Sequence, residues 1–199
     1  PGDHVIAEYP TYQPLYEIPR TLGADVEYWH IRREHGWNPD VTELEKLVRP
    51  DTKLICINNA SNPLGTVLDA ATLKRIAEIA ESVGAYVLSD EVYLPLHDTE
   101  SYVSMADLYD RAIVTNSLSK TYSVPGARIG WTASSPQIAE MLRPYRDYTM
   151  ICGGVFNDAL ATYVLEHKDK ILERNRKIVF GNRDIAQAWI DTQSRVSWT

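Results

Sequence analysis

Residues 117–130 read SLSKTYSVPGARIG and follow an apolar run at 112–115 that predicts a buried strand. The stretch holds a single lysine, Lys120, and a Pro-Gly turn shortly before Arg128. In a mainly parallel α/β sheet, ligands gather outside the carboxyl ends of the strands, because the loops there present backbone donors and helix N-termini. The stretch therefore indicates an α/β fold with a site at one edge of its sheet.

Strand and helix patterns alternate on both sides of this stretch. Apolar runs predict strands, spacing of 3.6 residues predicts helices, and Gly23 and Gly84 stand where two of the helices end. This alternation is typical of an α/β domain whose mainly parallel, mixed sheet is flanked by helices in three layers. The predicted strands are 5–8, 26–31, 53–58, 85–89, 112–115 and 128–133, and the predicted helices are 15–22, 38–48, 69–83 and most of the chain from 136, with a break at Gly153-Gly154.

The composition is that of an ordinary soluble globular protein, because 44% of the 199 residues are hydrophobic and 24% are charged. The formal net charge of -7 argues against nucleic acid as a partner, since proteins that bind it cluster Lys and Arg. No apolar run approaches the roughly 20 residues that a membrane-spanning helix needs. We therefore expect neither a nucleic acid nor a membrane partner.

The cysteines and histidines suggest no metal site and no disulfide. Cys56 and Cys152 are far apart in the sequence, so we expect two buried, unpaired thiols and a reducing, cytoplasmic location. The five histidines are dispersed, and none forms a pair at the spacing of metal ligands. The sequence therefore predicts no metal.

Four side chains in residues 117–130 suit an amine beside an anchored phosphate ester. Lys120 follows a buried strand, where we expect partial desolvation, and a desolvated amine is a better nucleophile. Ser117 and Ser119 supply hydroxyl donors, and Arg128 carries a guanidinium suited to bidentate binding of phosphate. A lone lysine in a loop is more often an exposed residue with no such role. The whole stretch, rather than Lys120 by itself, therefore indicates the site.

Three more motifs precede this stretch, and together they resemble the class I and II aminotransferases, the fold-type-I enzymes that use pyridoxal phosphate. The resemblance implies that pyridoxal 5'-phosphate is the cofactor and that Lys120 is the catalytic residue, which carries it as a Schiff base. It also implies that Ser117, Ser119 and Arg128 belong to the cofactor-binding set, with Ser117 and Arg128 on the phosphate. The three motifs are Tyr9-Pro10-Thr11-Tyr12, Asn58-Asn59-Ala60-Ser61-Asn62-Pro63-Leu64-Gly65 and Ser89-Asp90-Glu91-Val92-Tyr93.

The resemblance implies that the motif at residues 89–93 faces the ring of the cofactor. It implies that Asp90 pairs with the ring nitrogen, which keeps the ring protonated as an electron sink, and that Tyr93 bonds the ring hydroxyl. An acidic residue at a strand end can also simply cap the segment that follows. That interpretation of Asp90 stays open at this point, and Glu91 is expected to be a structural or solvent-facing neighbour.

The two earlier motifs complete the implied site. Asn62 would contact both the ring hydroxyl and the carboxylate of the substrate, and Tyr12 would stack on the ring. Tyr9 and Tyr16 are alternatives for the stacking residue, and any of the three tyrosines can be a plain core aromatic. Leu64 stands where the family more often has threonine, a departure that can reshape the pocket wall.

The resemblance implies transfer of an amino group between an amino acid and a 2-oxo acid, in a homodimer. Three alternatives remain: another reaction of the same cofactor, such as that of a lyase or a cyclising enzyme; a regulatory domain that binds the cofactor without turnover; and a fragment that is inactive in isolation although its parent is an enzyme. We expect residues 1–199 to be the large, cofactor-binding domain, in a fragment that lacks an N-terminal segment and a C-terminal small domain.

Overall fold

The computed structural model describes residues 1–96 and 102–198, in which the strands form one six-stranded mixed sheet. The strand order is β2-β1-β3-β4-β5-β6, and all neighbours are parallel except β5 and β6, which are antiparallel. The mainly parallel, mixed sheet predicted from the sequence is therefore confirmed. The strands are β1 (His4–Tyr9), β2 (Asp25–His30), β3 (Thr52–Asn58), β4 (Tyr86–Asp90), β5 (Ala112–Ser117) and β6 (Gly130–Ser134).

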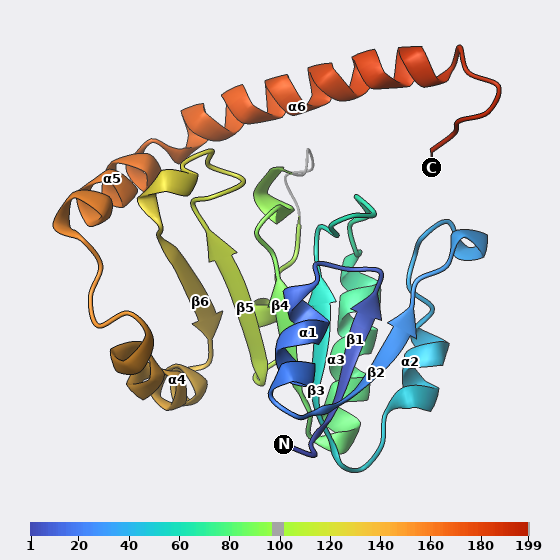
Figure 1. The fold of residues 1–199 in the computed structure, drawn as a ribbon, viewed down its shortest axis with the longest axis vertical. Coiled ribbons are helices and arrows are strands. Elements are labelled where there is room, and N and C mark those ends of the chain that lie inside the picture. The colour runs from blue at the N-terminus through green and yellow to red at the C-terminus, as the bar shows by residue number, and fades with distance from the viewer. Residues whose placement is uncertain (97–101, 199) are drawn as a thin grey trace.

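Helices lie on both faces of the sheet and along one of its ends (Figure 1). α1 covers one face of β1 and β3, while α2 and α3 cover the opposite face. α6 runs across the carboxyl ends of the parallel strands, and α4 and α5 lie beyond β6. The helices are α1 (Pro14–Thr21), α2 (Val41–Leu47), α3 (Ala70–Val83), α4 (Pro136–Thr149), α5 (Val155–Glu166) and α6 (Lys168–Ile190), with short 3-10 turns at Arg33–His35, Leu94–Leu96, Met105–Asp107 and Pro125–Ala127.

α3 shows how directly the sequence specifies these elements. The Asp69 carboxylate accepts a hydrogen bond of 2.7 Å from the backbone N–H of Thr72, which satisfies a donor at the start of the helix. Gly84 ends the helix with a φ of 69°, a left-handed conformation that glycine adopts without strain. Between these ends, the apolar stripe packs into the main core against the sheet; its buried residues are Leu73, Ile76, Ala77, Ile79 and Ala80.

The structure corrects two of the sequence predictions. Arg128 and Ile129 precede β6 instead of opening it, because the 3-10 turn at Pro125–Ala127 ends on Arg128 in a left-handed conformation with a φ of 51°. Cys152 is exposed and only Cys56 is buried, since Cys152 lies in the break between α4 and α5, outside the core clusters. The predicted break at Gly153-Gly154 is confirmed.

No helix in the described part of the chain is both long and apolar enough to cross a membrane.

Candidate active site

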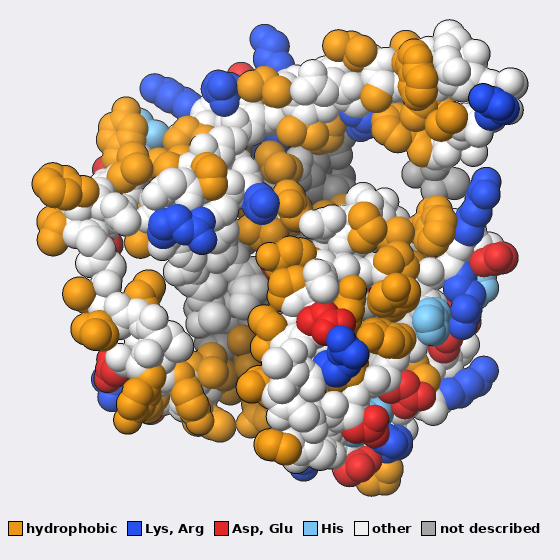
Figure 2. Space-filling model, viewed as in Figure 1, with side chains coloured by type: hydrophobic (Ala, Val, Ile, Leu, Met, Phe, Trp, Pro, Cys, Tyr) orange, Lys and Arg blue, Asp and Glu red, His pale blue; other side chains and the backbone are white. Residues whose placement is uncertain are grey.

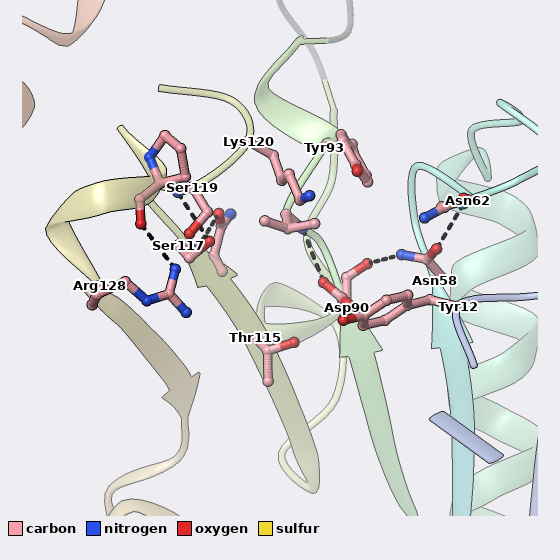
Figure 3. Close-up of a pocket in the computed structure, with 13 residues that line it drawn as sticks. Tyr12, Asn58, Asn62, Asp90, Tyr93, Thr115, Ser117, Ser119, Lys120 and Arg128 are labelled. Carbon is pink, nitrogen blue, oxygen red and sulfur yellow. Dashed lines mark hydrogen bonds between the residues drawn. The ribbon is translucent and has the colours of Figure 1, made fainter. Parts of the chain in front are cut away.

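A cavity of about 380 Å³ opens at the carboxyl ends of the parallel strands (Figure 3). Its walls come from the loops after β1, β3, β4 and β5 and from the turn before β6. All eight residues that the sequence predicted for the site line this one cavity: Tyr12, Asn62, Asp90, Tyr93, Ser117, Ser119, Lys120 and Arg128. It is also lined by Asn58, Val92, Thr115, Asn116 and Pro125, which the sequence analysis did not single out as site residues.

Asp90 ends β4 and presents a half-buried carboxylate to the cavity. Burial raises the pKa of Asp90 above its ordinary value, against smaller opposing effects from the backbone N–H of Val92 and the Thr115 hydroxyl. The backbone N–H of Val92 donates to Asp90 Oδ1 at 3.2 Å, so the capping interaction considered from the sequence is present. Asp90 forms no ion pair within residues 1–96 and 102–198. A desolvated carboxylate of this kind favours a cationic partner in the cavity.

Asn58 connects the loops that carry Asn62 and Asp90. Its side-chain Nδ2 donates to the backbone oxygen of Asp90 at 2.9 Å, and its Oδ1 accepts from the backbone N–H of Asn62 at 2.7 Å (Figure 3). The sequence analysis missed the role of this residue, although it is the last residue of β3 and the register partner of Asp90. The rule that strand ends gather ligand-binding residues would have found Asn58, and likewise Thr115 and Asn116 on β5.

The loop that carries Lys120 is tied to two other parts of the fold. Thr121 is fully buried, and its hydroxyl donates to the backbone oxygen of Val92 in the turn after β4. From α6, the buried Asn175 donates through Nδ2 to the backbone oxygen of Thr121 at 2.9 Å. Lys120 itself is exposed, so the partial desolvation expected from its place after a buried strand is wrong for this chain. The cavity is open on that side, and Figure 3 shows the lysine amine among the loops at its mouth.

Arg128 and two serines form a group of hydrogen-bond donors beside Lys120. The Ser117 hydroxyl accepts from the backbone N–H of Ser119 at 3.2 Å, which holds the turn between them. The exposed guanidinium of Arg128 donates to the backbone oxygen of Pro125 at 2.9 Å and forms no ion pair among the described residues. A guanidinium and two hydroxyls on one wall are a suitable donor set for a phosphate group.

Gly130 allows the two strands at this wall to approach closely. A Cβ at this position would lie 2.9 Å from the backbone oxygen of Asn116 and 3.2 Å from Cβ of Ser117, its register partner on β5. We therefore expect Gly130→Ala to push Ser117 away from Arg128 and to lower the free energy of unfolding by roughly 1–3 kcal/mol. Urea unfolding measures the loss, and Gly126→Ala, where a Cβ meets nothing within 4 Å, is the matched control. Equal stability of the two variants would contradict the expectation.

Of the three tyrosines considered for stacking, only Tyr12 lines the cavity. Its side chain is 48% exposed, so an open ring face is available. Tyr9 and Tyr16 pack against each other with ring centroids 5.7 Å apart, and Tyr28 contacts both rings. This packing makes Tyr9 and Tyr16 members of a separate aromatic cluster and leaves Tyr12 at the site.

The described residues hold no group of three or more His, Cys, Asp or Glu side chains placed to bind a metal ion. His97, one of the five histidines in the sequence, lies outside the described residues.

The fold and the cavity define an α/β domain with an amine, a half-buried carboxylate and a phosphate-type donor set at the carboxyl edge of one sheet. A family model for aminotransferase class I and II matches residues 1–188. The chain therefore belongs to the class I and II aminotransferase family, which confirms the resemblance stated from the motifs, and the fold type expected with it is confirmed by the solved relatives.

The relatives are about twice as long as this chain. A structure of a PLP-dependent aminotransferase from Streptococcus suis is 55% identical, with a TM-score of 0.95 over 100% of this chain and 53% of that one. A probable aspartate aminotransferase of Methanocaldococcus jannaschii is 31% identical over 178 residues, 86% of this chain and 47% of its own length. The capreomycidine synthase of Streptomyces vinaceus is 28% identical over 171 residues, 85% of this chain and 44% of its own length. The chain thus spans about half the length of the proteins it matches.

Proposed function

We propose that this chain is the cofactor-binding domain of a pyridoxal-phosphate-dependent aminotransferase, which moves an amino group between an amino acid and a 2-oxo acid. One observation carries the proposal: Asp90 at the end of β4 and Lys120 and Arg128 in residues 117–130 line one cavity. Membership of the aminotransferase family and the similarity to the Streptococcus suis enzyme support the same reaction.

The residues around the cavity fit pyridoxal phosphate group by group. The phosphate has Arg128, Ser117 and Ser119 on one wall, and the ring nitrogen has the desolvated carboxylate of Asp90, which forms no ion pair within the described residues. The ring hydroxyl has Asn62 and Tyr93, the exposed ring of Tyr12 is available for stacking, and Lys120 supplies the amine.

Pyridoxal phosphate, when bound, supplies an electron sink for the electron pair left when the α-carbon of the substrate loses its proton. Lys120 would hold the cofactor through Nζ, and the same amine, once free, would accept the α-proton of the substrate as a general base. Asp90 holds a proton at the ring nitrogen. Arg128, Ser117 and Ser119 keep the phosphate in place, so that the α-proton stays within reach of the lysine amine.

We also propose that the protein is a homodimer in the cytoplasm. Large apolar side chains gather at the surface over α4 and α5 (Figure 2). In the single chain, Tyr148 is 91% exposed and Phe156 is 90% exposed. Apolar side chains exposed to this degree favour cover by another surface, and a second copy of the chain would provide it. Both cysteines are free thiols, as expected for a reducing compartment.

The proposal is tested with the full chain, pyridoxal phosphate, a panel of ¹⁵N-labelled amino acids and a 2-oxo acid acceptor. We expect the label to appear in the amino acid formed from the acceptor. Release of labelled ammonia instead would indicate a lyase, and a cyclic product would indicate a cyclising enzyme, a class that the similarity to capreomycidine synthase makes worth measuring. Cofactor binding without any turnover would favour a regulatory domain.

A further inference from the structure

Glu8 is an acidic side chain buried in the sheet and hydrogen-bonded to Asn58, which lines the candidate active site. It is the fifth residue of β1 and only 4% exposed, and its register partner on β2 is Trp29. Because side chains alternate along a strand, Glu8 shares a face with Ile6, which belongs to the apolar core under α2 and α3. A carboxyl in such a core is costly unless it satisfies a polar group.

Glu8 satisfies the backbone of Asn58, the residue that joins the loops of the site. Oε2 of Glu8 accepts from the backbone N–H of Asn58 at 2.7 Å, and Asn58 in turn bonds the backbones of Asn62 and Asp90. Asn58 is itself only 1% exposed, so water cannot replace Glu8 as the acceptor without opening the sheet.

We propose that Glu8 is a positioning residue of the cofactor site, whose carboxyl fixes Asn58 and, through it, Asn62 and Asp90. This inference rests on the proposed function for the identity of the site, but the hydrogen bonds that carry it do not. Glu8 does not line the cavity, so its action on a bound molecule passes entirely through Asn58.

The protonation of Glu8 provides a signature that an ordinary packing residue lacks. Burial raises the pKa of Glu8 to about 8, against a smaller opposing effect of the Asn58 N–H. Among the described residues, Cys56 on β3 is an ionisable group that interacts with it; burial raises the pKa of this thiol to about 12, so the thiol stays neutral below that pH. Trp29 on β2 does not ionise, and the side chains buried on α2 and α3 are apolar.

The test follows the backbone amides of Asn58 and Asn62 by NMR from pH 6 to 10 in the full chain, without cofactor. We expect both amides of the wild type to shift with a midpoint of about 8. Glu8→Gln keeps an oxygen acceptor but cannot ionise, so its amides should lose that transition. Retention of the same transition in Glu8→Gln would overturn the proposal, and this readout holds even if bulkier changes at Glu8 prevent folding.

A second measurement is the dissociation constant for pyridoxal phosphate. Glu8→Leu keeps the volume of the side chain but leaves the backbone N–H of Asn58 without its acceptor. We expect this variant to bind pyridoxal phosphate roughly ten-fold more weakly than the wild type. Glu8→Gln should recover most of this loss, and Glu34→Leu, an exposed position, controls for the loss of a carboxylate. A folded Glu8→Leu protein that binds pyridoxal phosphate as tightly as the wild type would refute the positioning role.

The two proposals can fail separately. If the wild type itself binds no pyridoxal phosphate, the proposed function fails, and the amide shifts of Asn58 and Asn62 still decide the role of Glu8.

Discussion

Replacement of Lys120 by alanine is expected to lower the rate of amino-group transfer by about a thousand-fold or more. A positioned group that transfers a proton contributes roughly 10²–10⁴-fold to a rate, and Lys120 would also lose its bond to the cofactor. The amine is exposed and lines the cavity without belonging to the core, so the variant should fold. Single-turnover measurement of label transfer from a ¹⁵N-amino acid gives the rate.

The covalent role of Lys120 is checked separately from the rate. Borohydride treatment of the wild type with pyridoxal phosphate should attach the cofactor permanently to the peptide that contains Lys120, as seen by mass spectrometry. The Lys120→Ala protein should remain unlabelled, whereas Lys74→Ala, on the exposed side of α3, should be labelled as the wild type is. Equal labelling of all three proteins would contradict the assignment of Lys120.

The sequence predicted most of the fold because its local signals agree with one another. In α3 the capping Asp69 marks the start, Gly84 marks the end, and the apolar stripe at helical spacing fills the residues between them, so the three signals agree. The sequence predicts a strand from Arg128, but the 3-10 turn at Pro125–Ala127 ends on Arg128 in a left-handed conformation, and β6 begins only at Gly130. The prediction that Cys152 is buried rests on the fact that free cysteines are buried in most proteins. This average does not take into account that Cys152 lies in a break between two helices.

The site was predicted as a set of residues, whereas its supporting hydrogen bonds were not. Each motif contributes polar residues after a strand, and parallel strands bring their carboxyl ends to one edge, so convergence on one cavity follows from the order of the elements. The contacts of Asn58 with Glu8, Asn62 and Asp90 depend on the register between β1, β3 and β4. A register is a property of the assembled sheet, and no spacing within a single segment encodes it.

The register also explains why the capping and catalytic interpretations of Asp90 are compatible. Asp90 pairs with Thr115 on β5 and with Asn58 on β3, so it occupies the central part of the site. One carboxylate oxygen, Oδ1, accepts from Val92 N–H. Since a carboxylate has two acceptor oxygens, the cap leaves the charge of Asp90 available to a partner in the cavity.

Replacement of Asp90 by asparagine separates these two roles and is expected to lower the transfer rate by about 10²–10³-fold. The asparagine side chain keeps an oxygen for the Val92 N–H, so the turn after β4 should persist. It carries no charge, however, and cannot hold a proton at the ring nitrogen, and loss of one preorganised electrostatic partner typically costs that much in rate. The affinity for pyridoxal phosphate should fall less than the rate, because Arg128 and the serines still bind the phosphate.

The pH dependence of the affinity for pyridoxal phosphate provides a second test of Asp90→Asn. Burial raises the pKa of Asp90, so its protonated form persists in the empty site above the ordinary range of an aspartate, and pairing with a cation requires that proton to leave. The affinity of the wild type for the cofactor should therefore rise as the pH increases through the pKa of Asp90, and Asp90→Asn should lose this rise. Asp110→Asn, at an exposed position, should retain it. An unchanged pH profile in Asp90→Asn, together with a wild-type transfer rate, would show that the carboxylate acts only as a cap.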